Sequence, residues 1–296
     1  MNLRLRRTKL LAALALLAWG AGAHAAAAQS APRHVVSFNL CTDQLVVALA
    51  DPKQIAGLSP YAADPHVSVV AEQARNFRRL EWQAESVLPL APDLVLVGPW
   101  DRPVTRKILN ALGLRVVEVP LADDLDAVRA QIRSVAALLG HSDRGEDLIR
   151  RLDAARDRLA ALRQPGFSTA LVLERGGFTA GSASLVASIL AQAGLRPPPG
   201  SPGENGGYLS LERLLMLDPD LLFLKDPPSA PHDQGALMFT HPALEALYPP
   251  QRRIALPTRY TLCGGPAAVA ALDYMAGVMT RLAGRTLSGE ADTGSP

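Results

Sequence analysis

Cysteine and histidine are the side chains of this sequence best suited to covalent or metal chemistry, and their spacing excludes several kinds of site. Cys41 and Cys263 are the only cysteines, which rules out a four-thiolate zinc site and a Cys-x-x-Cys redox motif. No two histidines stand four residues apart, so no pair shares a helix face as metal ligands. The chain also lacks a Gly-x-Ser-x-Gly elbow, a Walker loop and a Gly-x-Gly-x-x-Gly turn. Support for an enzyme is therefore thin.

Up to residue 122, short β-branched runs alternate with helical segments over short links. Residues 34–38 form such a run, and Asn39 or Thr42 can cap the helix that follows. This alternation is typical of a parallel sheet with helical crossovers. The predicted strands are 34–38, 54–58, 93–97 and 115–119, and the predicted helices are one that ends before Asp51-Pro52, 85–90 and 104–112.

A helical stretch of nearly forty residues follows, and the alternation then restarts. From Leu125 to Arg163 apolar residues recur at helical spacing, and Gly140 marks one break. The predicted strands after it are 168–173, 220–224 and 254–256, and the predicted helices are 185–193, 211–217 and 267–282. The fold class expected is α/β, with two doubly wound lobes joined by a long helical connector.

An internal repeat supports the two-lobe arrangement. Residues 85–97 match residues 212–224 at a constant offset: a helix with an early glutamate ends at Pro-Asp, and a buried strand begins. Helix-Pro-Asp-strand segments are common in α/β proteins, so the match is weak alone. The even spacing, with the helical stretch between the copies, favours two related α/β lobes.

The chain resembles the periplasmic substrate-binding proteins of ABC importers for cobalamin, iron-siderophores and haem. The resemblance covers residues 32 to 284. It rests on the strand-loop-helix at Val35 to Leu49, the doubled Glu-x6-Pro-Asp-Leu segment, and Phe178-Thr179-Ala180-Gly181. It implies an N-terminal lobe (32–122), a long rigid helical connector (123–164), a C-terminal lobe (167–284) and a flexible tail (285–296).

The resemblance also implies a ligand held in the cleft between the lobes, at loops that follow the strands. This agrees with the rule that open α/β sheets bind ligands beyond the carboxyl ends of their strands. Aromatic side chains suit a corrin or a catecholate chelate, and arginines suit anionic chelates. Cobalamin is the first expectation and a ferric siderophore or haem the alternative, with no resident cofactor or metal. The candidate ligand residues are Asn39, Leu40, Cys41, Thr42, Tyr61, Trp100, Arg175, Phe178, Tyr208, Arg259, Tyr260 and Cys263.

Two glutamates occupy the positions at which relatives dock onto arginines of the membrane permease. These are Glu85 and Glu212, one in each copy of the repeat. A first-turn acid is also favoured by the helix dipole, and the two roles are compatible. The implied partners are an ABC permease dimer in the inner membrane and a small-molecule chelate, with the binding protein itself a monomer.

Cys41 and Cys263 open the first helix of one lobe and precede the last helix of the other, so the resemblance places both at the cleft. Three alternatives follow. They form a disulfide across the cleft, they contact the cargo or ligate its metal as thiols, or they stay unpaired in tight loops. The spacing along the sequence does not choose among these.

The N-terminus reads as a secretory signal peptide. Basic residues at 4–9 precede an apolar run, and Ala23-His24-Ala25 fits a cleavage site; a membrane anchor is the alternative. Removing residues 1–25 leaves 26 basic residues against 28 acidic ones, a poor balance for binding nucleic acid. The expected location is the periplasm.

Two other functions fit the sequence less well. One is an exported enzyme that uses Asp43, Arg175 and the cysteines, although no nucleophile-base pair has a recognisable spacing. The other is a ligand sensor that docks onto a receptor instead of an importer.

Overall fold

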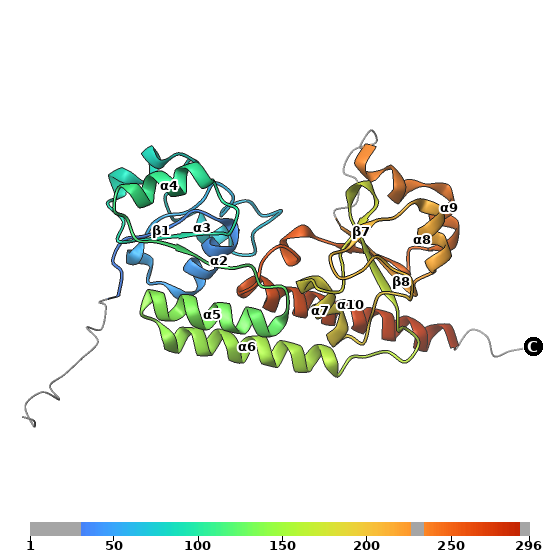
Figure 1. The fold of residues 1–296 in the computed structure, drawn as a ribbon. Helices are drawn as coiled ribbons and strands as arrows, with labels where there is room; N and C mark the ends of the chain where they lie inside the picture. Colours follow the sequence, from blue (N-terminus) through green and yellow to red (C-terminus); the bar gives the residue numbers. More distant parts are fainter. Residues whose placement is uncertain (1–30, 226–233, 291–296) are drawn as a thin grey trace, which may run out of the picture. The chain divides into compact units, whose positions relative to one another are not determined.

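The structure, a computed structural model, describes residues 31–225 and 234–290. The predicted signal peptide and residues 291–296 of the predicted tail lie outside these ranges. The described residues from Pro32 onward belong to one compact unit, and this unit has the expected α/β fold (Figure 1).

The first sheet is fully parallel, with the strand order β2-β1-β3-β4. Its central strands β1 and β3 are buried along their whole length, as expected where helices cover both faces. Successive side chains alternate between two cores, so Val35 and Leu94 lie in one core and Val36 and Val95 in the other. The elements of this lobe are β1 (Val35–Ser37), α2 (Leu40–Leu49), η1 (Pro52–Gln54), β2 (Ile55–Gly57), α3 (Ala71–Ala74), η2 (Ala84–Ser86), η3 (Leu88–Leu90), β3 (Leu94–Val97), α4 (Pro103–Ala111) and β4 (Val116–Glu118).

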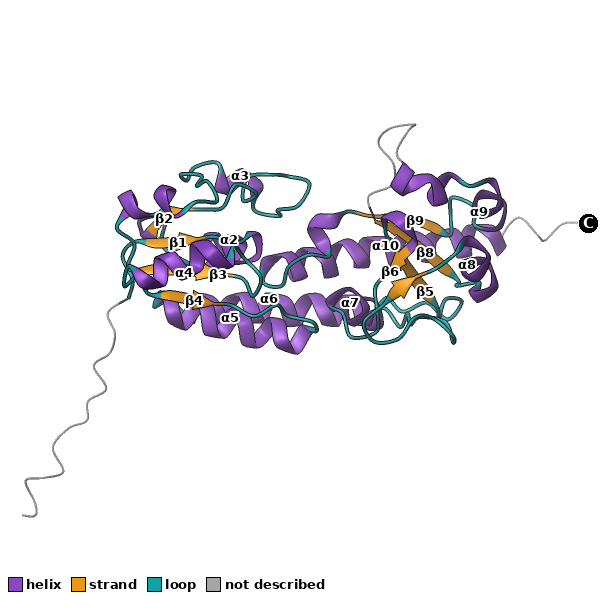
Figure 2. Ribbon diagram, turned by 45° about the horizontal axis from the view of Figure 1, so that its top comes forward, coloured by secondary structure: helices purple, strands orange, loops and turns teal. Residues whose placement is uncertain are grey.

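The second sheet is mixed, with the order β7-β6-β5-β8-β9. Strands β5, β8 and β9 are parallel (Figure 2), whereas β6 pairs antiparallel with β5 and β7. The sequence did not predict β6 or β7. The elements of this lobe are β5 (Ala170–Leu173), η4 (Arg175–Gly177), β6 (Phe178–Thr179), α7 (Leu185–Gln192), β7 (Gly207–Tyr208), α8 (Leu211–Leu217), β8 (Leu221–Lys225), η5 (Gln234–Thr240), α9 (Pro242–Leu247), β9 (Arg253–Leu256), η6 (Thr258–Tyr260) and α10 (Pro266–Glu290).

The connector is a helical hairpin, not the single long helix that the resemblance implied. Helices α5 (Leu125–Leu139) and α6 (Ser142–Ala160) meet at Gly140, whose φ of 81° lets the chain turn back. An ion pair joins Arg133 to Glu146 near the turn at 2.7 Å, and another joins Asp126 to Arg156 near the far end at 3.0 Å. This order of pairing shows that the helices are antiparallel.

The hairpin and α10 form a layer whose buried side chains join both lobes into one hydrophobic core. Val35 and Leu94 of the first sheet and Val172 and Phe223 of the second belong to the same buried cluster as the inner faces of α5, α6 and α10. Figure 1 shows α10 lying alongside α6. A continuous core of this kind resists large displacements between the lobes.

Two of the predicted helices differ from the prediction, one in its type and the other in where it ends. Residues 85–90 were expected to be helical but form two 3₁₀ turns, η2 and η3, because Pro89 lacks the N–H that a longer α-helix needs. The second copy of the repeat has Met216 at that position and forms the α-helix α8. Helix α10 continues to Glu290, past the predicted end at Leu282, and takes up the first part of the predicted tail.

Candidate functional site

The loop before α2 is fixed by its own polar side chains. Asn39 is the N-cap, and its Oδ1 accepts hydrogen bonds from the backbone N–H of Cys41 at 2.7 Å and of Thr42 at 3.4 Å. The Thr42 hydroxyl donates to the Asn39 carbonyl and shares a hydrogen bond with Ser37 Oγ. Thr42 is only 1% exposed, whereas Asn39, Leu40 and Cys41 are half-buried. The Thr42 side chain therefore holds the loop in place.

Cys41 and Cys263 form a disulfide with a Cα–Cα distance of 5.1 Å. This is the first of the three alternatives left open by the sequence, and it leaves neither cysteine as a free thiol. The bond joins the first turn of α2 to the loop between η6 and α10. It links the two lobes covalently at the carboxyl side of β1.

Two further contacts hold the same loops together. Arg259 Nη1 donates a hydrogen bond to the Pro65 carbonyl at 3.2 Å, so η6 reaches the loop that follows β2. Gly265 has a φ of 56°, and a Cβ there would lie 2.6 Å from Leu45 Cδ2 of α2. A Cβ on Gly264 would lie 2.7 Å from Gln131 Oε1, so the Gly264-Gly265 pair allows close packing against Gln131 and Leu45.

Arg259 and Tyr260 form a stacked group on the second lobe. The guanidinium of Arg259 lies 4.9 Å from the centroid of the Tyr260 ring, and that ring stacks on Tyr274 at 4.9 Å. Tyr274 donates a hydrogen bond to the Ala255 carbonyl and is thereby fixed against β9. The group is half-buried, so part of each side chain stays accessible.

Tyr61 belongs to an aromatic group on the first lobe that the sequence only partly indicated. Its ring lies 5.6 Å from Trp82, which packs edge-on against the buried Phe38 at the same distance. The guanidinium of Arg102 lies 4.9 Å from the Trp82 centroid. Trp82 and Arg102 were not among the candidate ligand residues, and no spacing in the sequence connects them to Tyr61.

A second aromatic pair lies on the antiparallel strands of the second sheet. Phe178 of β6 faces Tyr208 of β7 in the ladder, with ring centroids 5.4 Å apart. Tyr208 is 77% exposed, and Arg175, just before β6, is also exposed. Trp100, in the loop after β3, is 79% exposed. The sequence candidates thus fall into three places: the joined loops around the disulfide, the Phe178–Tyr208 pair, and Trp100.

Asp43 is a buried carboxyl directly beneath the joined loops. It accepts hydrogen bonds from the backbone N–H of Ser59 at 3.0 Å and from the Ser59 hydroxyl at 2.5 Å. Burial raises the pKa of Asp43 to about 7, against the hydrogen bonds of Ser37 and Ser59, which lower it. The carboxyl therefore ties α2 to the loop after β2.

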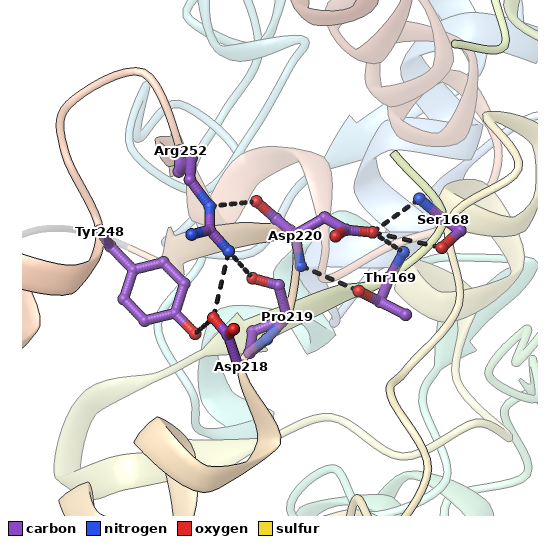
Figure 3. Close-up of polar contacts among 7 residues, drawn as sticks. All are labelled: Ser168, Thr169, Asp218, Pro219, Asp220, Tyr248 and Arg252. Carbon is purple, nitrogen blue, oxygen red and sulfur yellow. Dashed lines mark hydrogen bonds and ion pairs between the residues drawn. The ribbon is translucent and has the colours of Figure 1, made fainter. Parts of the chain in front are cut away.

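The Pro-Asp repeat has the same structural task in both lobes. Asp220 Oδ2 accepts hydrogen bonds from the backbone N–H groups of Ser168 and Thr169, each at 2.8 Å, at the start of β5 (Figure 3). Asp93 likewise accepts from the N–H groups of Arg33 and His34, just before β1. Each aspartate thus fixes the beginning of the neighbouring central strand, which explains why Pro-Asp recurs.

Arg252 forms a cluster of polar contacts around Asp220 in the second lobe (Figure 3). Arg252 donates to the carbonyls of Asp220 and Pro219 and to the carboxylate of Asp218, and its guanidinium lies 4.8 Å from the Tyr248 centroid. Burial raises the pKa of Tyr248, whose hydroxyl donates to Asp218 at 3.3 Å. This cluster supports the fold around α8.

The two glutamates of the repeat are exposed. Glu85 lies in η2, and Glu212 lies in the first turn of α8. The backbone N–H of Glu212 itself and the Ser210 hydroxyl hold the pKa of the Glu212 carboxyl below its usual value. Both carboxylates are thus available to a partner.

Candidate metal-ligand clusters and candidate membrane spans are both absent from the part of the chain that the structure describes. Among residues 31–225 and 234–290, no group of three or more His, Cys, Asp or Glu side chains is arranged to hold a metal ion. Within the same part of the chain, no helix combines the length and the apolar character needed to cross a bilayer.

The chain belongs to the periplasmic binding protein family, whose model matches residues 35–247. A search of curated protein sequences found no match.

Solved structures share the fold. A periplasmic heme binding protein from Pseudomonas aeruginosa is 23% identical, with a TM-score of 0.65 over 84% of this chain and 92% of its own. The heme-binding protein RhuT from Roseiflexus is 24% identical, with a TM-score of 0.69 over 85% and 99%. The vitamin B12 binding protein BtuF of Vibrio cholerae is 17% identical, with a TM-score of 0.63 over 85% and 98%.

Proposed function

We propose that this chain is the solute-binding component of an ABC importer and that it captures cobalamin or a related metal chelate between its lobes. Family membership supports the general role, and the similarity to heme and vitamin B12 binding proteins supports the class of cargo. A ferric siderophore or haem is the alternative within the same family, whereas an exported enzyme or a ligand sensor has less support. Residues 1–25 act as the signal that delivers the chain to the periplasm.

The observation that carries the proposal is the meeting of loops from the two lobes. The disulfide and the Arg259–Pro65 hydrogen bond bring the start of α2 and the loop of Tyr61 next to Arg259 and Tyr260. A corrin or porphyrin presents a broad π-rich face and carboxylate or amide edges. Tyrosine rings suit the face, and a guanidinium suits the edges.

The other exposed aromatic residues extend the proposed contact surface. Phe178 and Tyr208 form a fixed pair on β6 and β7, close to Arg175, and Trp100 stands at the carboxyl end of β3. Each lies in or beside a loop at a strand end, where α/β sheets bind their ligands. We assign Phe178, Tyr208 and Arg175 to the outer part of the same site and Trp100 to its rim, where it also precedes α4 by three residues.

Delivery to a permease dimer uses Glu85 and Glu212. Both carboxylates are exposed and stand at equivalent places of the two lobes, which fits two symmetry-related basic sites on a dimer. Replacing both by arginine should abolish import of the cargo and leave its affinity unchanged. Import that survives this double change would show that Glu85 and Glu212 do not dock the permease, and it would leave the cargo-binding role untouched.

Calorimetric titration tests the cargo directly. The chain without residues 1–25 is titrated with cobalamin, haemin and ferric catecholate and hydroxamate chelates, and we expect binding at micromolar concentration or tighter for one of them. Arg259→Ala should weaken that binding at least tenfold, because a charged hydrogen bond is worth about 1.5–3 kcal/mol. Arg150→Ala, at an exposed arginine of α6, is the matched control and should bind like the wild type.

Two results would contradict the proposal. One is the absence of heat with all four ligands from a folded, oxidised protein. The other is an equal loss of affinity in Arg259→Ala and Arg150→Ala, which would place the site away from the joined loops. Turnover of a ligand during the titration would instead favour the enzyme.

A further inference from the structure

Helix α4 and its C-cap residue carry a row of exposed apolar side chains. Val104, Ile108 and Leu112 follow one another at intervals of four residues and are 73%, 43% and 55% exposed. The adjacent row of the helix is anchored, because Leu109 is fully buried and the Thr105 hydroxyl donates to the Trp82 carbonyl. We call the three residues the α4 stripe.

An exposed tryptophan stands at the N-terminal end of the α4 stripe. Trp100 precedes α4 by three residues and is 79% exposed. Monomeric soluble proteins rarely place several large apolar side chains together in solvent without a partner. An indole beside aliphatic side chains is typical of surfaces that enter the boundary between lipid headgroups and acyl chains.

The charges around the α4 stripe are mainly positive. Lys107 and Arg115 are exposed, and within the described residues neither forms an ion pair. The segment 99–118 holds two acids: Glu118 pairs with Arg106, and Asp101 accepts a hydrogen bond from the Gly98 N–H at 2.6 Å. The exposed Glu85 of the neighbouring η2 adds a third negative charge, against the four cations Arg102, Arg106, Lys107 and Arg115. A cationic border around an apolar face attracts a negatively charged surface.

We propose that the α4 stripe, with Trp100, Lys107 and Arg115, docks the protein onto an anionic lipid surface. The combination of an amphipathic helix, an interfacial tryptophan and a basic border is complementary to anionic headgroups over acyl chains. A second copy of the chain fits less well, because two copies joined by this face would bring like charges together. The surface needs no cargo and no permease.

The position of α4 agrees with this role. The helix packs against η2, the turn that carries the exposed Glu85. If Glu85 meets a permease, as the proposed function holds, α4 lies close to the membrane around it. This supporting step rests on the proposed function, whereas the charge and exposure of α4 do not.

Vesicle binding tests the proposal without a permease. The chain without residues 1–25 is mixed with vesicles of phosphatidylglycerol and phosphatidylcholine or of phosphatidylcholine alone. We expect sedimentation with the anionic vesicles only, a blue shift of tryptophan emission, and weaker binding in 0.5 M salt. Replacing Lys107 and Arg115 by glutamine should reduce the affinity by about fivefold for each charge removed.

Variants at exposed apolar positions distinguish binding through the α4 stripe from non-specific hydrophobic binding to vesicles. Ile108→Asp should lose more than tenfold in affinity, and Val104→Asp, at a 73% exposed side chain, should lose as much while it keeps the thermal unfolding of the wild type. Met216→Asp, at a 75% exposed apolar residue of α8, is the matched control and should bind like the wild type.

Three outcomes would overturn the proposal. They are equal binding to neutral vesicles, unchanged binding by Ile108→Asp, and a dimer in sedimentation that Ile108→Asp dissociates, which would assign the α4 stripe to a second copy. Because the assay contains neither cargo nor permease, failure here would leave the proposed import function standing. Failure of cargo binding would likewise leave this proposal standing.

Discussion

Breaking the Cys41–Cys263 disulfide should lower the stability of the protein by a large and calculable amount. The two cysteines are 222 residues apart, so the bond closes almost the whole described chain into one loop. The loop-closure entropy for that length corresponds to about 5 kcal/mol at 25 °C, and this value is the upper end of what disulfides contribute. With a urea dependence of about 3 kcal/mol per molar, the unfolding midpoint should fall by about 1.7 M.

The assay is equilibrium unfolding in urea, followed by circular dichroism. The variants are Cys41→Ser, Cys263→Ala and the double change, and the wild type with reductant serves as a control without substitutions. Because either single change already breaks the bond, each should lose nearly the full amount and the double variant little more. This strong non-additivity distinguishes a shared bond from two independent packing effects.

Two results would refute this reasoning. One is a midpoint that stays the same in the double variant, although mass measurement shows the wild-type cysteines oxidised. The other is additive losses of about 1 kcal/mol for the two single variants, which would indicate that each cysteine contributes only through its own packing.

Three further predictions concern single positions. The raised pKa of Asp43 means that the folded state keeps a proton which the unfolded chain releases between pH 4 and 7. Stability should therefore fall by up to about 4 kcal/mol as the pH rises through this range and level off above pH 7, and Asp43→Asn should flatten that dependence in thermal unfolding. Asp220→Ala should cost about 1–2 kcal/mol in urea unfolding, because the N–H groups of Ser168 and Thr169, just before β5, lose a charged acceptor; an unchanged midpoint would contradict the role given to the repeat. Gly181→Ala should lower the unfolding temperature, because its Cβ would lie 1.9 Å from the Glu204 carbonyl oxygen, whereas Gly166→Ala, with nothing within 4 Å, should not.

The elements that the sequence predicted well are those with strong local signals. Strands β3 and β8 follow Pro-Asp and begin with four buried apolar residues, and α8 runs from Leu211 to Leu217 as predicted. The break at Gly140 was also predicted, but its consequence was not, because a glycine in the left-handed region can end a helix without determining where the next one packs. Strands β6 and β7 have only two residues each and show no periodicity.

The candidate site was predicted in composition but not in arrangement. Pairing of the cysteines depends on a Cα separation that only the folded chain supplies. The grouping of Trp82 with Tyr61 joins loops 21 residues apart through tertiary packing, and the burial of Thr42 follows from the hydrogen bonds of Asn39 and Ser37. The sequence pattern predicts which residue types lie at strand ends. It does not predict their side-chain partners, because these depend on how loops distant in the sequence pack together.

The position of the two disulfide cysteines along the chain sets an order of events during biosynthesis. Cys41 belongs to the first helix and Cys263 precedes the last, so at a synthesis rate of about 5–20 residues per second some 10–45 s separate their appearance. During that interval the earlier thiol has no native partner and is open to mixed disulfides. The first sheet has a core of its own, around Phe38, Val97 and Leu109, that can form while the chain is still growing. Covalent closure therefore has to wait until Cys263 has been added, and a chain truncated before Cys263 would keep Cys41 as a reactive free thiol.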